Sequence, residues 1–280
     1  MKVGIFDSGL GGLSVLHCAK KLFPDADYIY YADEQHVPYG EKSPAEIRGF
    51  VEEIFHFLIA KGVDAIVIAC NTATTMVDKA YRKQFSIPIV GMEPAVKKAV
   101  ELYGSEGKRI LVAATPVTIH GNKLKTLVTK VDRENESDLI ALPGLVRFAE
   151  KTIFDGEAVE EYLKNELLKY SPREYGTIVL GCTHFNYFKK VLQKLFQGNV
   201  HFVDGNEGTI HQLMRLLDMS AMKTGQGSVE YYVSGSLASK VEMKKIEICL
   251  QQLDIVDLID KEYEYGVKKH FTTISGGRGF

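Results

Sequence analysis

Short apolar runs alternate with helical patterns along the first third of the chain. Lys2–Phe6 and Tyr28–Tyr31 resemble short strands, and Ala65–Ala69 is continuously apolar, as in a parallel strand buried on both faces. Between these runs, apolar residues recur at helical spacing over Leu13–Lys20, and Ser43–Ala60 begins as a helix with a capping box. The alternation predicts right-handed βαβ units and a parallel sheet.

The same alternation returns after a polar stretch around Gly104–Arg109. The further strands that we expect are Ile87–Val90, Ile110–Ala113, Ile178–Leu180, Val200–Val203 and Val229–Val233. The further helices begin near Glu93 and at Thr115-Pro116, or span Glu157–Tyr170 and Glu207–Asp218. We expect a surface turn at Asp132–Asp138 and, after one last helix, a frayed polar tail at Thr272–Phe280.

Composition narrows the class of protein. The 280 residues, 45% of them hydrophobic, suffice for a sizeable core and predict one large domain or two medium ones. The formal net charge is −2, and Lys and Arg are spread along the chain. This charge balance favours neither nucleic acid nor an anionic membrane as a partner.

The N-terminus lacks the apolar core of a signal peptide, and no run approaches the roughly 20 apolar residues of a membrane span. We therefore expect a cytoplasmic location. The cysteines, Cys18, Cys70, Cys182 and Cys249, form no CxxC pair and no dense framework. Free thiols are the expected state.

One short pattern occurs twice. Ala65–Thr72 and Thr177–His184 each contain three apolar residues, one small residue, a cysteine and two polar residues. The two cysteines, Cys70 and Cys182, lie about one domain length apart. In open parallel sheets, ligands bind beyond the carboxyl ends of strands, where helix N-termini stabilise negative charge. Two similar halves packed face to face would place two thiols on opposite sides of one cleft.

Opposed thiols suit the inversion of a carbon that carries a hydrogen. That reaction removes a proton from one face and delivers another to the opposite face. The ordinary pKa of cysteine, about 8.5, can be tuned so that one residue is a thiolate and the other a thiol. Asp7 and His184 could assist Cys70 and Cys182, and nearby short polar side chains suit a carboxylate and an ammonium group: Ser8, Asn71, Thr72 and Thr183.

Four motifs stand in order along the chain: Asp7-Ser8-Gly9, Pro38-Tyr39-Gly40, Cys70-Asn71-Thr72-Ala73 and Gly181-Cys182-Thr183-His184. With them the sequence resembles the glutamate racemases of the aspartate/glutamate racemase family, from Lys2 to about Thr209. The resemblance implies an α/β fold of two pseudo-symmetric flavodoxin-like domains with mostly parallel sheets and the active site between them. We expect residues 1–95 plus 208–280 to form the first domain and residues 96–207 the second.

The resemblance also implies a reaction and its residues. It implies cofactor-independent interconversion of L- and D-glutamate in a homodimer, with D-glutamate as a precursor of peptidoglycan and no bound metal. Cys70 would exchange the α-proton on the D-glutamate side with the help of Asp7, and Cys182 on the L-glutamate side with the help of His184. Glu150 matches an acidic position near Cys182. The substrate-holding positions are Asp7, Ser8, Tyr39, Gly40, Asn71, Thr72, Thr183 and His184.

Other interpretations of single residues stay open. A cysteine after an apolar run is often a buried filler, which fits Cys18 and Cys249. Asp7 could cap a helix, Tyr39 could be a packing aromatic, and Glu150 could belong to a solvated helix face. A zinc site at Cys182 and His184 lacks a second Cys/His pair.

The loop Gly9-Leu10-Gly11-Gly12 fits neither phosphate-loop pattern, so a sharp turn from strand to helix explains its glycines better. Two other functions remain as alternatives. One is a racemase or isomerase of aspartate or a related acid, and the other is a catalytically inactive binding protein.

Overall fold

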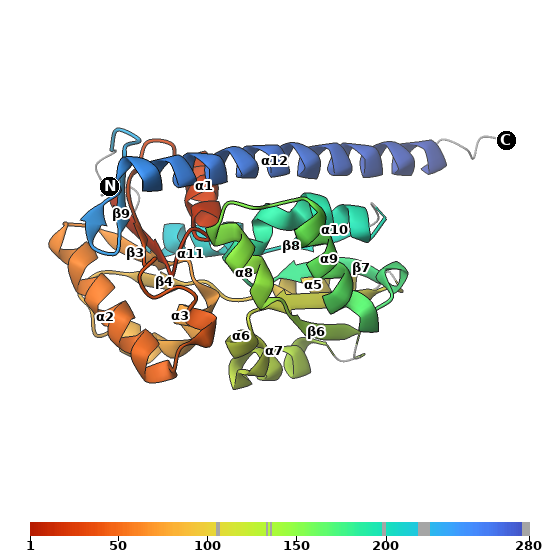
Figure 1. Ribbon diagram of the computed structural model, residues 1–280, viewed down its shortest axis with the longest axis horizontal. Coiled ribbons are helices and arrows are strands. Elements are labelled where there is room, and N and C mark those ends of the chain that lie inside the picture. Colours follow the sequence, from red (N-terminus) through yellow and green to blue (C-terminus); the bar gives the residue numbers. More distant parts are fainter. Residues whose placement is uncertain (105–106, 133, 135, 198–199, 218–224, 276–280) are drawn as a thin grey trace.

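Two sheets form the framework of the molecule (Figure 1). The computed structural model describes residues 1–104, 107–132, 134, 136–197, 200–217 and 225–275, with side chains as far as residue 258. The first sheet has the strand order β10 (Ser236–Leu237), β9 (Val229–Val233), β2 (Asp27–Ala32), β1 (Lys2–Asp7), β3 (Ala65–Ile68), β4 (Ile89–Gly91). The second has the order β6 (Ser137–Ala141), β5 (Arg109–Ala114), β7 (Tyr175–Leu180), β8 (His201–Val203).

The strands pair in parallel, apart from the short antiparallel pair β9–β10. This confirms the predicted α/β class with mostly parallel sheets. The α-helices are α1 (Leu13–Leu22), α2 (Pro44–Ala60), α3 (Asn71–Met76), α4 (Lys79–Arg82), α5 (Val96–Tyr103), α6 (Pro116–His120), α7 (Asn122–Val131), α8 (Pro143–Glu150), α9 (Glu157–Glu166), α10 (Lys189–Leu195), α11 (Asn206–Leu216) and α12 (Lys240–Ser275). The 3₁₀ helices are η1 (Tyr39–Glu41), η2 (Leu167–Lys169), η3 (Pro172–Glu174) and η4 (Thr183–Phe188).

Alternating strand residues build three core clusters. In β1, Val3 and Ile5 belong to a cluster that also includes Leu111 and Ala113 of β5, so one core joins the inner faces of both sheets. Phe6 points to the opposite face of its sheet and packs in the cluster with α2. The opposite face of the second sheet packs in a third cluster with α5 and α7. Strands β1, β3, β5 and β7 are thus buried on both faces, as their apolar composition predicts.

The chain returns to the first sheet after completing the second. Strand β9 pairs with β2, and α11 packs on α1, although both elements follow the second sheet in sequence. The return of β9 and α11 to the first half supports the division into residues 1–95 plus 208–280 and residues 96–207, which we retain as a proposal. Among the helices that the structure describes, none combines the length and the apolar composition needed to cross a bilayer.

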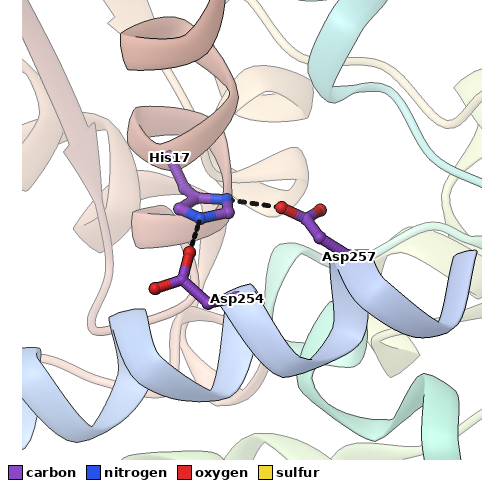
Figure 2. A group of neighbouring side chains, drawn as sticks. All are labelled: His17, Asp254 and Asp257. Carbon is purple, nitrogen blue, oxygen red and sulfur yellow. Dashed lines mark hydrogen bonds and ion pairs between the residues drawn. The ribbon is translucent and has the colours of Figure 1, made fainter. Parts of the chain in front are cut away.

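Helix α12 crosses the molecule on top of α1 and continues past α10 (Figure 1). His17 of α1 lies between two carboxylates of α12, with Nε2 2.8 Å from Asp254 Oδ1 and Nδ1 3.7 Å from Asp257 Oδ2 (Figure 2). The Lys21 ammonium also pairs with Asp257. Beside these contacts, α12 buries Ile246, Cys249, Leu253 and Val256. Cys249 is therefore the core filler that the sequence indicates, whereas Cys18 is half-buried.

The structure corrects several expected boundaries. Ser137 and Asp138, expected in a surface turn, belong to β6, because pairing with β5 extends the strand backwards. The side chain of Asp132, at the end of α7, accepts the N–H groups of Glu136 and Ser137 at 3.0 and 2.8 Å, where β6 begins. Pairing with β5 likewise starts β7 at Tyr175. Both extensions arise from pairing with β5. The added residues show no pattern of their own in the sequence that would predict a strand.

Two helices also differ from their expected extents. The expected helix Glu157–Tyr170 changes to the 3₁₀ helix η2 after Glu166. Helix α12 continues to Ser275, so the frayed tail expected from Thr272 is wrong as far as Ser275. The remainder of that tail, 276–280, and Asp218 lie outside the described residues.

Helix α2 offers a test of helix propensity. Its predicted capping box is confirmed, with Ser43 Oγ accepting from Glu46 N–H at 3.3 Å and Glu46 Oε2 accepting from Ser43 N–H at 2.9 Å. Gly49 lies inside α2, and an added Cβ would meet nothing within 4 Å. We expect Gly49→Ala to raise the free energy of unfolding by about 0.5–1 kcal/mol, because alanine loses less backbone entropy. Denaturant unfolding measures the change.

Gly91→Ala is the contrasting variant in β4. Its Cβ would lie 2.6 Å from Thr74 Cγ2 and 2.7 Å from Arg82 Nη1. Overpacking of this kind costs about 1–3 kcal/mol, so we expect destabilisation. Equal effects of the two glycine substitutions would contradict this explanation.

Candidate active site

Cys70 lies immediately beyond strand β3. It is the N-cap of α3, where its Sγ accepts the N–H of Ala73 at 3.4 Å. The thiol lies 3.9 Å from Ser8 Oγ, at the end of the neighbouring strand β1. Because parallel strands β1 and β3 end at the same sheet edge, residues far apart in sequence meet here.

Cys182 occupies the corresponding place after β7. Gly181 N–H donates to Ala113 O at 2.7 Å, and a Cβ at this position would lie 2.9 Å from the same oxygen. Glycine thus allows the chain to leave the sheet close to β5. Cys182 Sγ then lies 3.7 Å from Nδ1 of His184, in the 3₁₀ helix η4. The repeated sequence pattern therefore produces a thiol at a strand end in each sheet.

The two thiols line one pocket between the two sheets, although both are buried. Its narrow cavity measures about 20 Å³. Nine residues singled out from the sequence lie in its wall: Ser8, Tyr39, Gly40, Cys70, Asn71, Thr72, Cys182, Thr183 and His184. A cavity of this volume holds about one water molecule, so a larger ligand enters only when the walls move apart.

Asp7 and Glu150 lie behind the pocket wall. Asp7 is fully buried, and its Oδ2 accepts from Thr183 Oγ1 at 2.7 Å, across the boundary between the two halves. Its Oδ1 accepts from Ser8 Oγ and Gly9 N–H, both at 3.1 Å. Burial raises the pKa of Asp7, against the lowering effects of the His184 charge and of the hydrogen bonds from Thr183 and Gly9. Asp7 caps no helix, since the N-cap of α1 is Gly12.

His184 joins Cys182 to Glu150. Its Nε2 lies 2.5 Å from Glu150 Oε1, while its Nδ1 faces the sulfur. Glu150 also accepts the N–H of Leu10 at 2.8 Å, and its side chain is only 15% exposed. The solvated helix face considered for Glu150 is therefore wrong. With both ring nitrogens protonated, His184 can donate to the sulfur and to the carboxylate together.

The environment of Cys70 differs from expectation. A thiol at a helix N-terminus was expected to have a stabilised thiolate, but burial raises the pKa of Cys70, and the charge of Asp7 raises it further. The hydrogen bond from Ala73 N–H opposes this effect without overcoming it. Desolvation outweighs the helix terminus because the sulfur is shielded from water. Cys70 is thus a protonated thiol at neutral pH.

The remaining wall residues have distinct surroundings. Tyr39 Oη donates to Asp33 Oδ2 at 2.6 Å, so this tyrosine is both packed and hydrogen-bonded. Asn71 Oδ1 is buried with no hydrogen-bond partner among the described residues. Sequence analysis missed Thr115, which also lines the pocket and whose Oγ1 lies 3.0 Å from Thr72 Oγ1. Its place directly after β5 was a usable signal. Pro38 and Val146, likewise missed, complete the wall.

The pH response of His184 can be measured directly. Burial alone lowers its pKa, but the hydrogen bonds and charges of Cys182 and Glu150 raise it by more, so the pKa lies well above 6.5. We expect NMR titration to find His184 protonated at neutral pH, and Glu150→Gln to lower its pKa. The stabilisation from this pair is complete below about pH 6.5 and is lost as the pH rises through the raised value. An unchanged pKa in Glu150→Gln would contradict the assigned pairing.

A two-sheet α/β fold with one thiol per half at a shared pocket fits a racemase. The chain belongs to the Asp/Glu/Hydantoin racemase family, whose family model matches residues 14–213. It is therefore an isomerase.

Comparison with individual proteins is consistent with this assignment. The chain is 48% identical over 260 residues to a glutamate racemase of Lachnospira eligens, covering 91% of this chain and 98% of that protein. Its fold is similar to that of Escherichia coli glutamate racemase in complex with L-glutamate, with a TM-score of 0.78, 29% identity and coverage of 90% and 94%. The D-glutamate complex of the Francisella tularensis glutamate racemase gives a TM-score of 0.74, 27% identity and coverage of 89% and 93%.

Proposed function

We propose that this protein interconverts L- and D-glutamate by a two-thiol mechanism that uses no cofactor. The observation that carries the proposal is the placement of Cys70 and Cys182 in the wall of one pocket, each at the end of a strand in a different sheet. Removal and return of an α-proton on opposite faces requires two acid/base groups on opposite sides of the substrate.

In the L to D direction, the Cys182 thiolate takes the α-proton of L-glutamate, so that the C–H bond breaks and an S–H bond forms. The Cys70 thiol then gives its proton to the opposite face of the α-carbon and becomes a thiolate. The raised pKa of Cys70 supports this order, because the group that donates must begin as a thiol. In the D to L direction the two roles reverse.

The neighbouring groups support each thiol. His184, held by Glu150, can donate a hydrogen bond to Cys182 and so stabilise it as the thiolate that takes the α-proton. Asp7 acts on the Cys70 side through Ser8, to which both are hydrogen-bonded. Its bond to Thr183 also fixes the two walls relative to each other.

Glutamate as the substrate rests on the relatives, which are named glutamate racemases and include complexes with both enantiomers. Asn71 Oδ1 suits the α-ammonium group, which is a donor for an otherwise unpartnered acceptor. The other groups proposed to hold the substrate are Ser8, Tyr39, Gly40, Thr72, Thr183 and His184, to which we add Thr115.

The decisive experiment follows the circular dichroism of L-glutamate with purified protein, without added cofactor. We expect the signal to decay to that of the racemic mixture, and the decay to persist after dialysis against a chelator. Faster inversion of L-aspartate would favour the aspartate alternative. Binding of glutamate without exchange of its α-hydrogen for deuterium would favour an inactive binding protein.

We also propose that the D-glutamate formed supplies peptidoglycan synthesis in the cytoplasm, and that the protein acts as a homodimer. Analytical ultracentrifugation of the full chain tests the dimer. Restoration of growth to a bacterium that requires D-glutamate tests the physiological role.

A further inference from the structure

The glycine-rich loop between β1 and α1 packs against Glu150 and His184 of the opposite half. A Cβ added to Gly9 would lie closer than 3.0 Å to Glu150 Oε1, and one added to Gly11 closer than 3.0 Å to His184 Nδ1. The glycines thus make room for Glu150 and His184, besides turning the chain from strand to helix. The loop belongs to the first half of the molecule, whereas Cys182 belongs to the second.

One peptide group of this loop is hydrogen-bonded at both ends. The C=O of Gly9 accepts from Tyr30 Oη at 2.7 Å, and the N–H of Leu10, in the same peptide group, donates to Glu150 Oε1 at 2.8 Å. Glu150 in turn pairs with Nε2 of His184. A continuous chain of hydrogen bonds therefore runs from Tyr30 in β2 through the peptide and Glu150 to His184, beside the Cys182 sulfur.

We propose that Tyr30 is a positioning residue for the Cys182 side of the reaction, acting through the Gly9–Leu10 peptide on Glu150 and His184. The proposal rests on the proposed function, because it assigns His184 to the support of Cys182 during proton transfer. Its physical basis is cooperative: donation to a peptide carbonyl polarises the peptide and strengthens its N–H as a donor. Tyr30 thereby fixes the place of Glu150 and limits how strongly this carboxylate holds the His184 proton.

The Tyr30 hydroxyl can donate its hydrogen bond to the Gly9 carbonyl at any working pH. Its side chain is fully buried in β2, and burial raises its pKa well above 10, with the charges of Asp7 and Glu150 adding to the effect. The hydroxyl therefore stays protonated over the working pH range.

Tyr187 provides a matched control. It is also fully buried, and its Oη donates to the C=O of Leu10 at 2.6 Å. That carbonyl belongs to the next peptide group, which does not include the N–H bound to Glu150. Tyr30→Phe and Tyr187→Phe each remove one buried hydroxyl that donates to a carbonyl of this loop. Only Tyr30→Phe interrupts the chain of hydrogen bonds to His184.

The test compares the two variants in kinetics and NMR. We expect Tyr30→Phe to lower kcat for L-glutamate about fivefold and to shift the pH profile of kcat/KM, while Tyr187→Phe stays within about twofold of the wild type. The His184 pKa should rise in Tyr30→Phe, because a weaker Leu10 N–H leaves Glu150 a stronger acceptor, and should not change in Tyr187→Phe. Tyr30→3-fluorotyrosine, with a more acidic hydroxyl, should shift this pKa in the opposite direction and also serves if Tyr30→Phe folds poorly.

Equal kinetics in the two Phe variants, together with an unchanged His184 pKa, would overturn the assignment of Tyr30. A wild-type protein that does not racemise glutamate would overturn the proposed function instead. The NMR titration would still decide in that case whether Tyr30 acts on His184.

Discussion

We expect replacement of either Cys70 or Cys182 by serine to lower glutamate racemisation about 10²–10⁴-fold without unfolding the protein, since in the proposed mechanism each variant loses one of two acid/base groups. Serine has nearly the size of cysteine, so packing around β3 and β7 is preserved. Its hydroxyl is a far weaker acid than a thiol and cannot become an anion readily at neutral pH. Circular dichroism of the substrate measures racemisation, and far-ultraviolet spectra check the fold.

The two serine variants should also differ from each other. With Cys182 intact, Cys70→Ser should still exchange the α-hydrogen of L-glutamate in deuterated water, more readily than that of D-glutamate. Cys182→Ser should show the opposite preference. Cys18→Ser is the control, because its half-buried sulfur lies outside the pocket that holds the two thiols. Full racemase activity in either active-site variant would exclude the two-thiol mechanism, and equal exchange of both enantiomers would exclude the assigned sides.

Gly11→Ala is expected to reduce activity about 10²-fold, the scale of loss caused by displacing a catalytic group by about 1 Å. The added methyl would lie closer than 3.0 Å to three ring atoms of His184. The imidazole must then move away from Cys182, from Glu150 or from both. The cost in stability is about 1–3 kcal/mol, which a domain with typical stability of about 5–15 kcal/mol tolerates.

Kinetics and His184 NMR signals together test this displacement. We expect Gly11→Ala to shift those signals and to impair L-glutamate exchange more than D-glutamate exchange. Gly49→Ala adds the same methyl to exposed α2, where nothing lies within 4 Å, and should leave both properties unchanged. Wild-type activity in Gly11→Ala would show that the loop does not hold His184 in place.

Much of the fold follows from local sequence. The apolar runs of β1, β2, β3 and β5 specify buried parallel strands, and the Ser43/Glu46 capping box specifies where α2 begins. Each of these signals arises within a few residues, from side-chain periodicity or from hydrogen bonds to the nearest turn. For the same reason the repeated cysteine pattern places both thiols at strand ends.

Tertiary structure decided the contacts between the halves. Glu150 is 140 residues from Leu10, whose N–H it accepts, and Asp7 is 176 residues from Thr183. No local pattern indicates such pairs, because they depend on how two separately patterned sheets pack together. The packing places His184 and Glu150 against the glycine-rich loop. It also buries Cys70 enough to raise the pKa of its thiol. The sequence by itself determined the main strands and the positions of the two thiols at their ends. The surroundings of the thiols were determined by burial and by hydrogen bonds between distant residues, because these arise only when the two halves pack together.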